Sequence, residues 1–359
     1  VRERTMRRIP VQWLLVGLLV ILAAISPTLL QGQQYWMFIA LQAFFWAMLA
    51  SSWALLAGYA GQFSFGHIAF MAIAAYASGI LGERLGWSTV SGIIAGTLLS
   101  GFVGLIVGYL CLRLRSTYLA LFTIAFAEIV RLVINAEQDL TGGPMGLYMD
   151  YLLPTTSYVP YYYVMLALLI ASLAFMHFLV NSRFGLFFRS IREDEVAAAA
   201  MGVHVVRYKI MAFVVTSMVA GLAGAVDHHI IGFIAPSELI IPRMSLIIAM
   251  AVIGGTESLI AAALGAIFIH FSLELLQEIP MPAALMPTIK ANAPLLQNIG
   301  LGVGDSGIQT NAWRMVAFGL LLMFTLRFRR NGLIQPLIER ITRRGAAEET
   351  VAKRQIAAD

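Results

Sequence analysis

The sequence has few charged residues. Only 12% of its 359 residues are Asp, Glu, Lys or Arg, whereas 60% are hydrophobic, and the mean hydropathy is +0.82. Water-soluble globular domains are about 45–50% apolar, because a larger apolar share leaves too little polar surface to face water. The composition therefore excludes a soluble globule and predicts an all-α polytopic membrane protein.

Cysteine and nucleotide-binding motifs are also scarce. Cys111, the single cysteine, lies in an apolar run, so neither a disulfide framework nor a cysteine-based metal cluster is expected. The sequence has no G-x-x-x-x-G-K-[ST] phosphate loop, which excludes nucleotide hydrolysis by that chemistry. No convergent nucleophile, acid or metal set is visible, so we expect no enzyme. Any ATP-driven work would come from partner subunits, and no cofactor is expected in this chain.

What the sequence has instead is apolar runs. Ten are long enough to cross a bilayer, for which a helix needs about 20 residues. The first follows an Arg-rich start and lacks a small-residue cleavage pattern, so we expect a retained first helix. The runs are Val11–Leu30, Tyr35–Ala57, Gly66–Gly82, Ser88–Leu112, Thr117–Ala136, Pro160–Val180, Ile210–Ile234, Leu239–Gly254, Ser258–Ile279 and Ala312–Leu326.

Lys and Arg gather on one side of these runs. With the N-terminus inside, most of the 24 Lys and Arg fall before the first run, after the fourth, between the sixth and seventh, and after the last. The positive-inside rule therefore favours both termini in the cytoplasm. The expected organisation is a basic cytoplasmic start (1–10), a transmembrane domain (11–326) with a cytoplasmic loop (181–209), and a cytoplasmic tail (327–359).

The cytoplasmic loop contains a stretch, Ser190–Gly202, that is too charged to enter lipid. Ser190 and Glu193 have the spacing of a capping box, and Gly202 stands where a helix ends, which predicts one helix of about three turns. Its body holds four alanines, whose small side chains permit close approach of another protein. Two interpretations stay open: a helix that docks with a partner, or a connecting helix without one.

The second and third runs are joined by Gly58–His67, which is rich in glycine and has no Lys, Arg, Asp or Glu. Such backbone is tolerated at membrane depth only where it is buried in protein or lines a cavity. One interpretation is a broken helix beside a solute path, since unwound segments offer backbone groups to substrate. The other is a tight turn between helices. The candidate path residues are Gly58, Gly61, Gln62, Ser64, Gly66 and His67.

The segment Glu137–Val159, between the fifth and sixth runs, is acidic and has no positive charge. A charged outer rim steers and orients an incoming soluble protein, so Glu137, Asp139 and Asp150 are candidates for such a contact. The Gly-Gly-Pro at 142–144 is first of all a turn signal. A second outer segment, 280–311, is rich in Gly and Pro and is expected to be irregular.

Ionisable residues inside the runs are functional candidates by default. Glu128 and Arg131 are one helical turn apart and could neutralise each other on the bundle interior, which would lower the cost of burying either charge; the sequence leaves open whether they pair. The other groups are His270 with Glu274 at i, i+4, and the trio Asp227, His228 and His229. Consecutive histidines point to different helix faces, so a metal site is not expected. These groups keep an ion-coupled transporter open as a competing class.

Glycines recur along two runs at spacings that suit close helix crossings. They are Gly92, Gly96, Gly101, Gly104, Gly108, Gly221 and Gly224. We interpret them as packing residues rather than a site.

Taken together, the motifs resemble the LivM-type permease subunit of branched-chain amino-acid ABC importers over about 41–333. The resemblance rests on six segments in this order: Gly58–Phe70, Tyr118–Ile129, Thr141–Leu147, Ile191–Gly202, Ala220–Gly224 and Val252–Gly255. It implies a type II-like importer fold in the bacterial cytoplasmic (inner) membrane. It also implies four kinds of contact: a second, LivH-type permease, two ATP-binding subunits, a periplasmic or extracellular amino-acid-binding protein, and lipid. No nucleic-acid partner is expected.

The resemblance also implies residue roles. The Ala197-Ala198-x-x-x-Gly202 spacing is similar to the permease loop that enters a cleft in the ATPase subunit, although Val196 stands where many such permeases carry Glu. Near the end of the chain, 330–333 departs from the family's usual Pro-containing version. The implied coupling residues are Glu193, Asp194, Glu195, Ala197, Ala198, Ala199 and Gly202.

A branched aliphatic amino acid is a zwitterion with an apolar side chain. Its path should be mostly apolar with a few neutral hydrogen-bonding groups, because unpaired fixed charge would hold one end too tightly. Thr123 joins the Gly58–His67 candidates on this ground, with Gln42, Ser52 and Ser245 as further neutral groups. An importer of urea or short amides stays open as the alternative.

Overall fold

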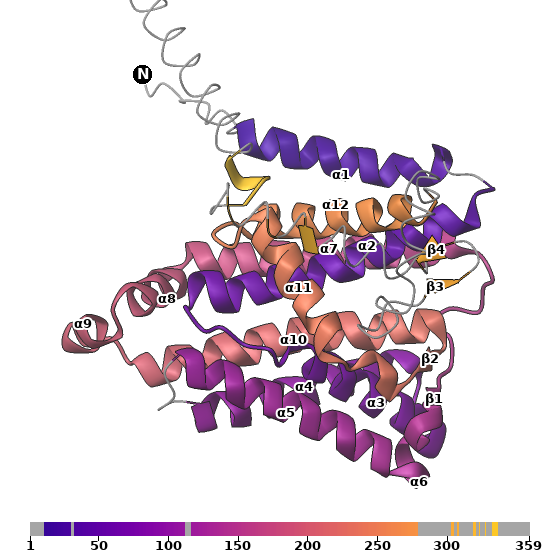
Figure 1. The fold of residues 1–359 in the computed structure, drawn as a ribbon, viewed down its shortest axis with the longest axis horizontal. Helices are drawn as coiled ribbons and strands as arrows, with labels where there is room; N and C mark the ends of the chain where they lie inside the picture. Colours follow the sequence, from indigo (N-terminus) through magenta and orange to yellow (C-terminus); the bar gives the residue numbers. More distant parts are fainter. Residues whose placement is uncertain are drawn as a thin grey trace, which may run out of the picture.

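The structure is a computed structural model that describes residues 11–29, 32–111, 116–278, 303–304, 307–308, 319–320, 323, 327 and 332–336. Its long helices lie on either side of α2 (Figure 1). On one side are α1 (Val11–Leu29), α7 (Tyr158–Asn181) and α12 (Leu259–Glu278). On the other are α3 (His67–Leu85), α4 (Thr89–Leu110), α5 (Ser116–Ala136) and α10 (Val205–Ile231), and α11 (Ile241–Gly254) crosses between the two groups.

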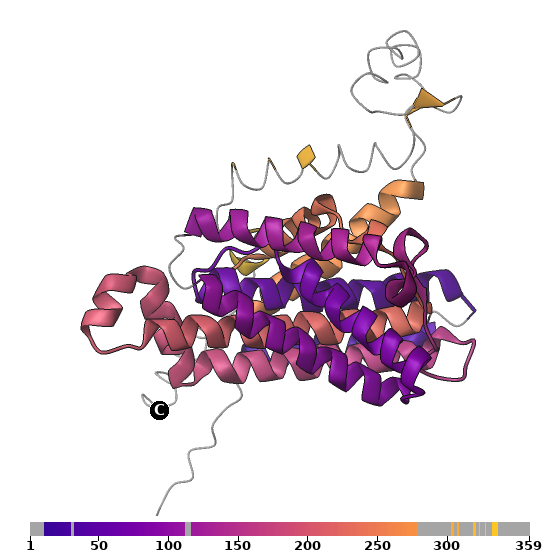
Figure 2. The same cartoon turned by 90° about the horizontal axis from the view of Figure 1, so that it is seen from below.

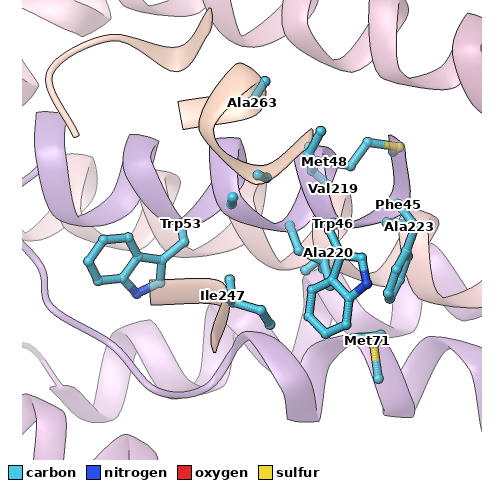
Figure 3. Close-up of a cluster of buried hydrophobic side chains, with 14 of the residues drawn as sticks. Phe45, Trp46, Met48, Trp53, Met71, Val219, Ala220, Ala223, Ile247 and Ala263 are labelled. Atoms are coloured by element: carbon cyan, nitrogen blue, oxygen red, sulfur yellow. The ribbon is translucent and has the colours of Figure 1, made fainter. Parts of the chain in front are cut away.

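Helix α2 (Gln34–Ala54) is the centre of the bundle. Every residue from Ile39 to Leu56 is buried inside the protein, which explains why this helix is apolar all round. Phe45 and Trp53 of α2 are fully buried, and Figure 3 shows them among side chains of α3, α10, α11 and α12. The core is therefore assembled around α2, whose length beyond its first turn is enclosed by other helices.

Glycines bring α4, α3 and α10 into close contact. A Cβ at Gly96 would lie 2.3 Å from the carbonyl oxygen of Ala74, and one at Gly104 would lie 2.0 Å from Oγ of Ser217. A Cβ at Gly224 would lie 2.2 Å from the side chain of Met71. These distances leave no room for a side chain, so the predicted close crossings are confirmed.

The number of spans differs from the expected ten. The described residues hold six helices long and apolar enough to cross a membrane, or seven if α11 and α12 count as one broken span. These two helices meet at a bend of 119°, and only the two together are long and apolar enough to span. Helix α11 has 14 residues, about 21 Å at 1.5 Å per residue, which is shorter than a ~30 Å hydrocarbon core. The expected span Ala312–Leu326 lies mostly outside the described residues.

The two ends of the bundle carry different small elements. At one end α8 (Arg183–Glu193) and α9 (Glu195–Ala200) project from the bundle (Figures 1 and 2). At the other end lie α6 (Gln138–Thr141), the 3-10 turns η3 (Gly143–Met145) and η4 (Pro236–Glu238), and the antiparallel pair β1 (Leu147–Tyr148) and β2 (Phe233–Ile234). A second strand pair joins β3 (Val303–Gly304) to β4 (Gly307–Ile308).

Candidate functional site: the projecting helices and the helix break

The stretch 190–202 is not one helix, so the predicted capping box is wrong. Helix α8 begins after Ser182, whose hydroxyl accepts from the Phe184 N–H at 3.2 Å, and it runs through Ser190 to Glu193. Ser190 therefore lies inside a helix and donates to the Phe187 carbonyl at 2.9 Å. A Ser inside a helix bonds back to the preceding turn instead of capping.

Asp194 is the residue that begins α9. Its backbone is extended, and its Oδ1 accepts from the N–H groups of Val196 at 2.9 Å and Ala197 at 3.0 Å. A carboxylate in this position satisfies two of the N–H groups that a helix start leaves unpaired. The helix that follows has six residues, and after it the backbone of Gly202 takes φ = +84°. The result is a short, separately capped helix rather than the three-turn helix expected.

Helix α9 exposes apolar side chains at its tip. Val196 and Met201 are 79% and 85% exposed, and Ala197 and Ala199 are exposed beside them. Ala198 is instead 5% exposed and packs with Ile191 and Val205. The implied coupling residues thus divide into an inward alanine and an outward surface. The outward surface is apolar, although α9 belongs to a segment too charged to enter lipid. An exposed apolar surface outside lipid is typical of a contact with another protein.

The acidic residues of this segment have local partners. Glu195 accepts from Lys209 at 2.6 Å, and Glu193 accepts from Arg192 at 2.9 Å. With Asp194 serving as the cap, all three predicted coupling carboxylates make contacts within the chain. Their first effect is therefore to fix α9, and contact with a partner would come second.

The predicted break between α2 and α3 is confirmed. Helix α2 ends in a π-helical turn, η1 (Leu55–Tyr59), and the chain is non-helical until α3 begins at His67. Gly61 takes φ = +68°, a left-handed conformation that glycine adopts without the steric penalty of a Cβ. Single π turns are rare and occur frequently at functional sites. The segment is a non-helical connection, 60–66, between two helices that are each long enough to span.

Backbone groups of the break are satisfied by side chains. Nε1 of Trp53 donates to the Ser64 carbonyl at 2.8 Å, and the N–H of Gly66 donates to Oγ of Ser64 at 3.0 Å. The N–H of Phe65 donates to Oγ1 of Thr123 at 2.9 Å. Thr123 is a path candidate because its side chain is polar and neutral, and this hydrogen bond places it beside the Gly58–His67 candidates.

Gln62 and His67 are buried polar side chains of the break, 3% and 0% exposed. Neither the oxygen nor the nitrogen of the Gln62 amide makes a hydrogen bond of ordinary geometry to the part of the chain described. The backbone of Ser52 is a polar neighbour of the His67 imidazole, although neither imidazole nitrogen makes a hydrogen bond of ordinary geometry there. Buried polar atoms are normally paired, so the Gln62 amide is the unusual group of this segment.

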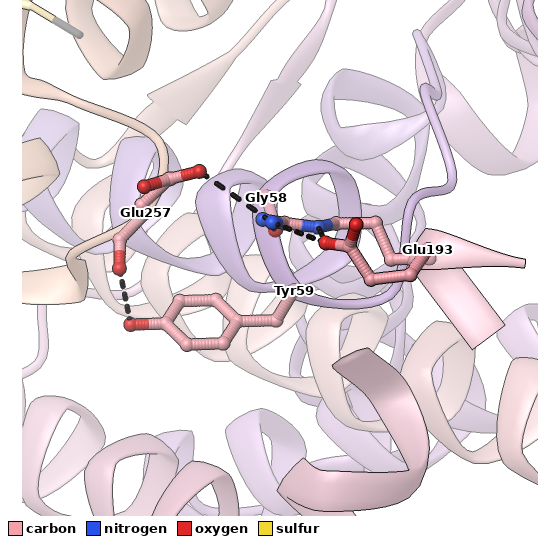
Figure 4. A network of polar contacts seen from close by, with 5 residues as sticks. Gly58, Tyr59, Glu193 and Glu257 are labelled. Atoms are coloured by element: carbon pink, nitrogen blue, oxygen red, sulfur yellow. Dashed lines mark hydrogen bonds and ion pairs between the residues drawn. The ribbon is translucent and has the colours of Figure 1, made fainter. Parts of the chain in front are cut away.

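A junction at the α9 end of the bundle went unnoticed in the sequence. Figure 4 shows Gly58 and Tyr59 of the π turn beside Glu193 and Glu257. Arg192 contacts Gly58, Glu193 and Glu257. Nη1 of Arg192 donates to the Gly58 carbonyl at 2.5 Å, and Nη2 lies 3.5 Å from Oε1 of Glu257. The signal in the sequence that points to this junction is the single arginine of the 191–202 motif.

The acidic segment Glu137–Val159 is held against the bundle by contacts of its backbone. Pairing of Leu147 with Ile234 attaches it to the end of α10, and the ring of His229 lies 2.6 Å from the Asp150 carbonyl. Arg84 of α3 donates to the Asp139 carbonyl, so a positive charge absent from the segment's own sequence is supplied by the fold. The side chains of Glu137, Asp139 and Asp150 stay exposed.

The trio at 227–229 lies in a buried polar cluster near the same end. Nε2 of Gln42 donates to Oδ1 of Asp227 at 2.8 Å, and His228 lies 3.2 Å from Glu238, which also accepts from Arg243 at 2.6 Å. Within the described residues no group of three His, Cys, Asp or Glu side chains is arranged to hold a metal ion.

Glu238 is the anionic centre of this cluster. Burial alone would raise the pKa of its carboxyl, but the hydrogen bond and charge of His228 and the charge of Arg243 lower that pKa to about 2. Glu238 is therefore ionised at neutral pH and links the end of α10 to the start of α11.

Glu128 and Arg131 do form a pair, but not on the bundle interior. Nε of Arg131 donates to Oε2 of Glu128 at 3.0 Å, and the side chains of Arg131 and Glu128 are 27% and 37% exposed. The pair is therefore on the flank of α5 and not on the bundle interior.

His270 and Glu274, the i, i+4 pair of α12, also have neighbours within the chain. Glu274 accepts from Tyr35, and the His270 ring lies 6.4 Å from the ring of Trp46.

A bundle of span-length apolar helices, with a buried break and a small helix projecting at one end, defines a multi-pass membrane permease. The chain belongs to the family described as branched-chain amino acid transport system / permease component, whose model matches residues 35–326.

The relatives carry the same description. The chain is 27% identical over 276 residues to the high-affinity branched-chain amino acid transport system permease protein LivM of Salmonella typhimurium, covering 69% of this chain and 65% of that protein. It is 29% identical over 266 residues to the LivM of Escherichia coli, covering 65% and 61%. A probable LivM of Methanocaldococcus jannaschii is 26% identical over 160 residues, covering 42% and 46%. The matches thus span less than two thirds of each relative, and no solved structure matches the chain.

Proposed function

We propose that this chain is a translocation subunit of an ATP-driven, binding-protein-dependent importer of branched-chain amino acids. The observation that carries the proposal is the family match over 35–326, joined by relatives named for this transport. The chain would not itself hydrolyse ATP. Two ATP-binding subunits would do so, and a second, LivH-type permease and a soluble amino-acid-binding protein would complete the complex.

The docking site for an ATP-binding subunit would be the exposed surface of α9. Val196, Ala197, Ala199 and Met201 offer an apolar tip on a helix held rigid by the Asp194 cap and the Glu195–Lys209 pair. Small side chains let the backbone approach a partner closely. Gly202 would permit the turn back into α10, because its φ of +84° favours glycine.

The break would contribute polar groups to the path. Gln62 and His67 are neutral candidates with unused hydrogen-bonding atoms, and Ser64 and Thr123 hold the backbone around them. An amino acid passing here would meet donors and acceptors with apolar walls from Phe63 and Phe65. Such a lining suits a zwitterion with an aliphatic side chain better than fixed charge would.

The orientation in the bacterial inner membrane follows from charge. The α8–α9 end would be cytoplasmic together with both termini, because it carries the Arg and Lys residues between 183 and 209. The opposite end, with Glu137, Asp139 and Asp150 exposed, would receive the soluble binding protein.

Uptake by the complete complex in vesicles tests the proposal. Labelled leucine should enter only with ATP and binding protein, and unlabelled isoleucine and valine should block it whereas urea should not. Collapse of the ion gradients with ATP supplied should leave uptake intact. Competition by urea but not by isoleucine would favour the amide importer, and uptake driven by an ion gradient without ATP would favour the ion-coupled class.

A further inference from the structure

Three segments that are far apart in the sequence meet at the α9 end of the bundle. The first is the last turn of α8. The second is the π turn η1 together with Gly61, which follows it, and the third is the loop 255–258 that joins α11 to α12 (Figure 4). A Cβ at Gly58 would lie 1.9 Å from the carbonyl oxygen of Thr256, so the π turn and this loop are in backbone contact. The hydroxyl of Tyr59 donates to the Glu257 carbonyl at 2.7 Å, which fastens the same two segments again.

Arg192 is the side chain that joins α8 to both. Its guanidinium donates to the Gly58 carbonyl at 2.5 Å and lies 3.5 Å from the Glu257 carboxylate. A Cβ at Gly61 would lie 3.0 Å from Cγ and 3.1 Å from Cα of Arg192, so the backbone of the break also rests on this residue. A helix end leaves its last carbonyls without helical partners, and Arg192 supplies the missing donor to one of them.

The position of Arg192 relative to α9 is fixed. Arg192 is two residues before Asp194, whose side chain caps α9, and the intervening Glu193 binds the Arg192 guanidinium at 2.9 Å. Helix α8 itself is anchored by other residues, since Phe188 is fully buried and Ile191 is 6% exposed. Arg192 is therefore not needed to hold α8 on the bundle, and its polar contacts beyond α8 are with the break and the 255–258 loop.

We propose that Arg192 is the positioning residue that transmits movement of α9 to the helix break and to the α11–α12 turn. This inference rests on the proposed function, because it assumes that α9 moves when the ATP-binding subunits act. The strong part of the contact is the hydrogen bond from the charged guanidinium to the Gly58 carbonyl, because hydrogen bonds made by charged groups are stronger than those between neutral groups. The carboxylates of Glu193 and Glu257 are 72% and 57% exposed, and exposed ion pairs contribute little.

The first test compares Arg192→Gln with Arg183→Gln in the whole complex. Arg183 is exposed on the first turn of α8 and provides the same charge change on the same helix. Arg192→Gln should leave assembly and ATP hydrolysis in place and lower leucine uptake per ATP about tenfold, the factor that corresponds to ~1.4 kcal/mol. Arg192→Lys, which keeps the charge but not the forked donor, should fall between. Arg183→Gln should stay within about twofold of the unmodified complex. Equal uptake per ATP in Arg192→Gln and the unmodified complex would overturn the inference.

The second test follows the conformation of the break and does not need transport. The variant Phe63→Cys places a thiol in the break, in a Cys111→Ser background. The rate at which a thiol reagent labels this cysteine is measured with and without ATP trapped on the ATP-binding subunits. We expect a several-fold change in rate on ATP trapping, and loss of that change when Arg192→Gln is added. A change that persists with Arg192→Gln, or no change in the unmodified background, would contradict the transmission role. If the complex moves no leucine while the labelling change is present and depends on Arg192, the proposed substrate fails and the transmission role stands.

Discussion

At the residue scale, the break depends on backbone geometry that few residues permit. Gly61 has φ = +68° and its backbone lies against Arg192, and Gly58 lies against the Thr256 carbonyl. Thr123 accepts the Phe65 N–H from a different helix. Each of these residues fixes a position in the segment by close approach or by a hydrogen bond, and each gives a direct prediction.

Gly61→Ala is expected to distort the break. A non-glycine residue in the left-handed region costs roughly 1–2 kcal/mol, and the added Cβ would also press on Arg192. Leucine uptake should fall, and Gly61→Leu should lower it further. The control is Gly82→Ala on α3, where a Cβ would meet no atom closer than 3.8 Å. The interpretation fails if Gly61→Leu transports like the unmodified complex.

Thr123→Val should destabilise the contact between α5 and the break. The valine keeps the shape but leaves the Phe65 N–H without its acceptor, and a buried unpaired donor costs about 1–3 kcal/mol. The complex should therefore unfold at a lower temperature in a thermal melt. Thr123→Ser keeps the hydroxyl and should melt close to the unmodified complex, so equal melting of the Val and Ser variants would contradict the assignment.

At the scale of elements, α9 separates two roles within one run of alanines. Ala198 packs inward on Ile191 and Val205, whereas Ala199 faces out beside the exposed Val196 and Met201. Substitutions at neighbouring positions should therefore fail in different ways, because one disturbs the packing of α9 and the other its outer surface.

Ala199→Glu should uncouple the complex without destabilising this chain. A charge on the apolar docking surface disfavours the contact with the ATP-binding subunit, so uptake and co-purification of that subunit should both fall at least tenfold. Ala198→Leu should instead overpack the inner face at a cost of about 1–3 kcal/mol and lower the melting temperature. Full uptake by the Ala199→Glu variant would remove α9 as the docking element.

At the scale of the whole molecule, α10 runs without interruption from the α9 end to the opposite end. It has 27 residues, about 40 Å at 1.5 Å per residue, and its far end pairs through β2 with the acidic segment and binds Asp150 through His229. The acidic segment and the α9 end of the bundle are thus attached to the same helix. This arrangement gives the exposed carboxylates of the acidic segment a fixed backbone from which to meet a partner.

Charge reversal of Glu137, Asp139 and Asp150 should weaken docking of the soluble binding protein. Exposed charges steer association and are screened by salt, so the apparent affinity should fall most at low ionic strength. The matched amide variants, Glu137→Gln with Asp139→Asn and Asp150→Asn, should have a smaller effect of the same sign. An affinity and salt dependence unchanged by reversal would mean that the segment is only solvated.

The sequence alone determined the class of protein and the approximate position of the six span-length helices of the described residues. A 60% hydrophobic composition and runs of about 20 apolar residues predict membrane helices whatever their packing, and the glycine-rich Gly58–His67 segment interrupted the pattern where the structure has its break. The close crossings at Gly96, Gly104 and Gly224 were also readable, because only small residues permit such approach.

What the tertiary structure decided depends on contacts between distant segments. Helix α8 begins at Arg183 and ends at Glu193, so Ser190 lies inside it and Asp194 is the residue that caps α9. The local Ser190–Glu193 pattern could not reveal this. The bend between α11 and α12 left them short of two full spans, and the inward side of Ala198 was set by Ile191 and Val205. Arg192 became informative only when Gly58 and Glu257, 134 and 65 residues away, were brought to its guanidinium. Hydrophobic periodicity is a local property of the chain, whereas the partner of a polar side chain is chosen by the fold.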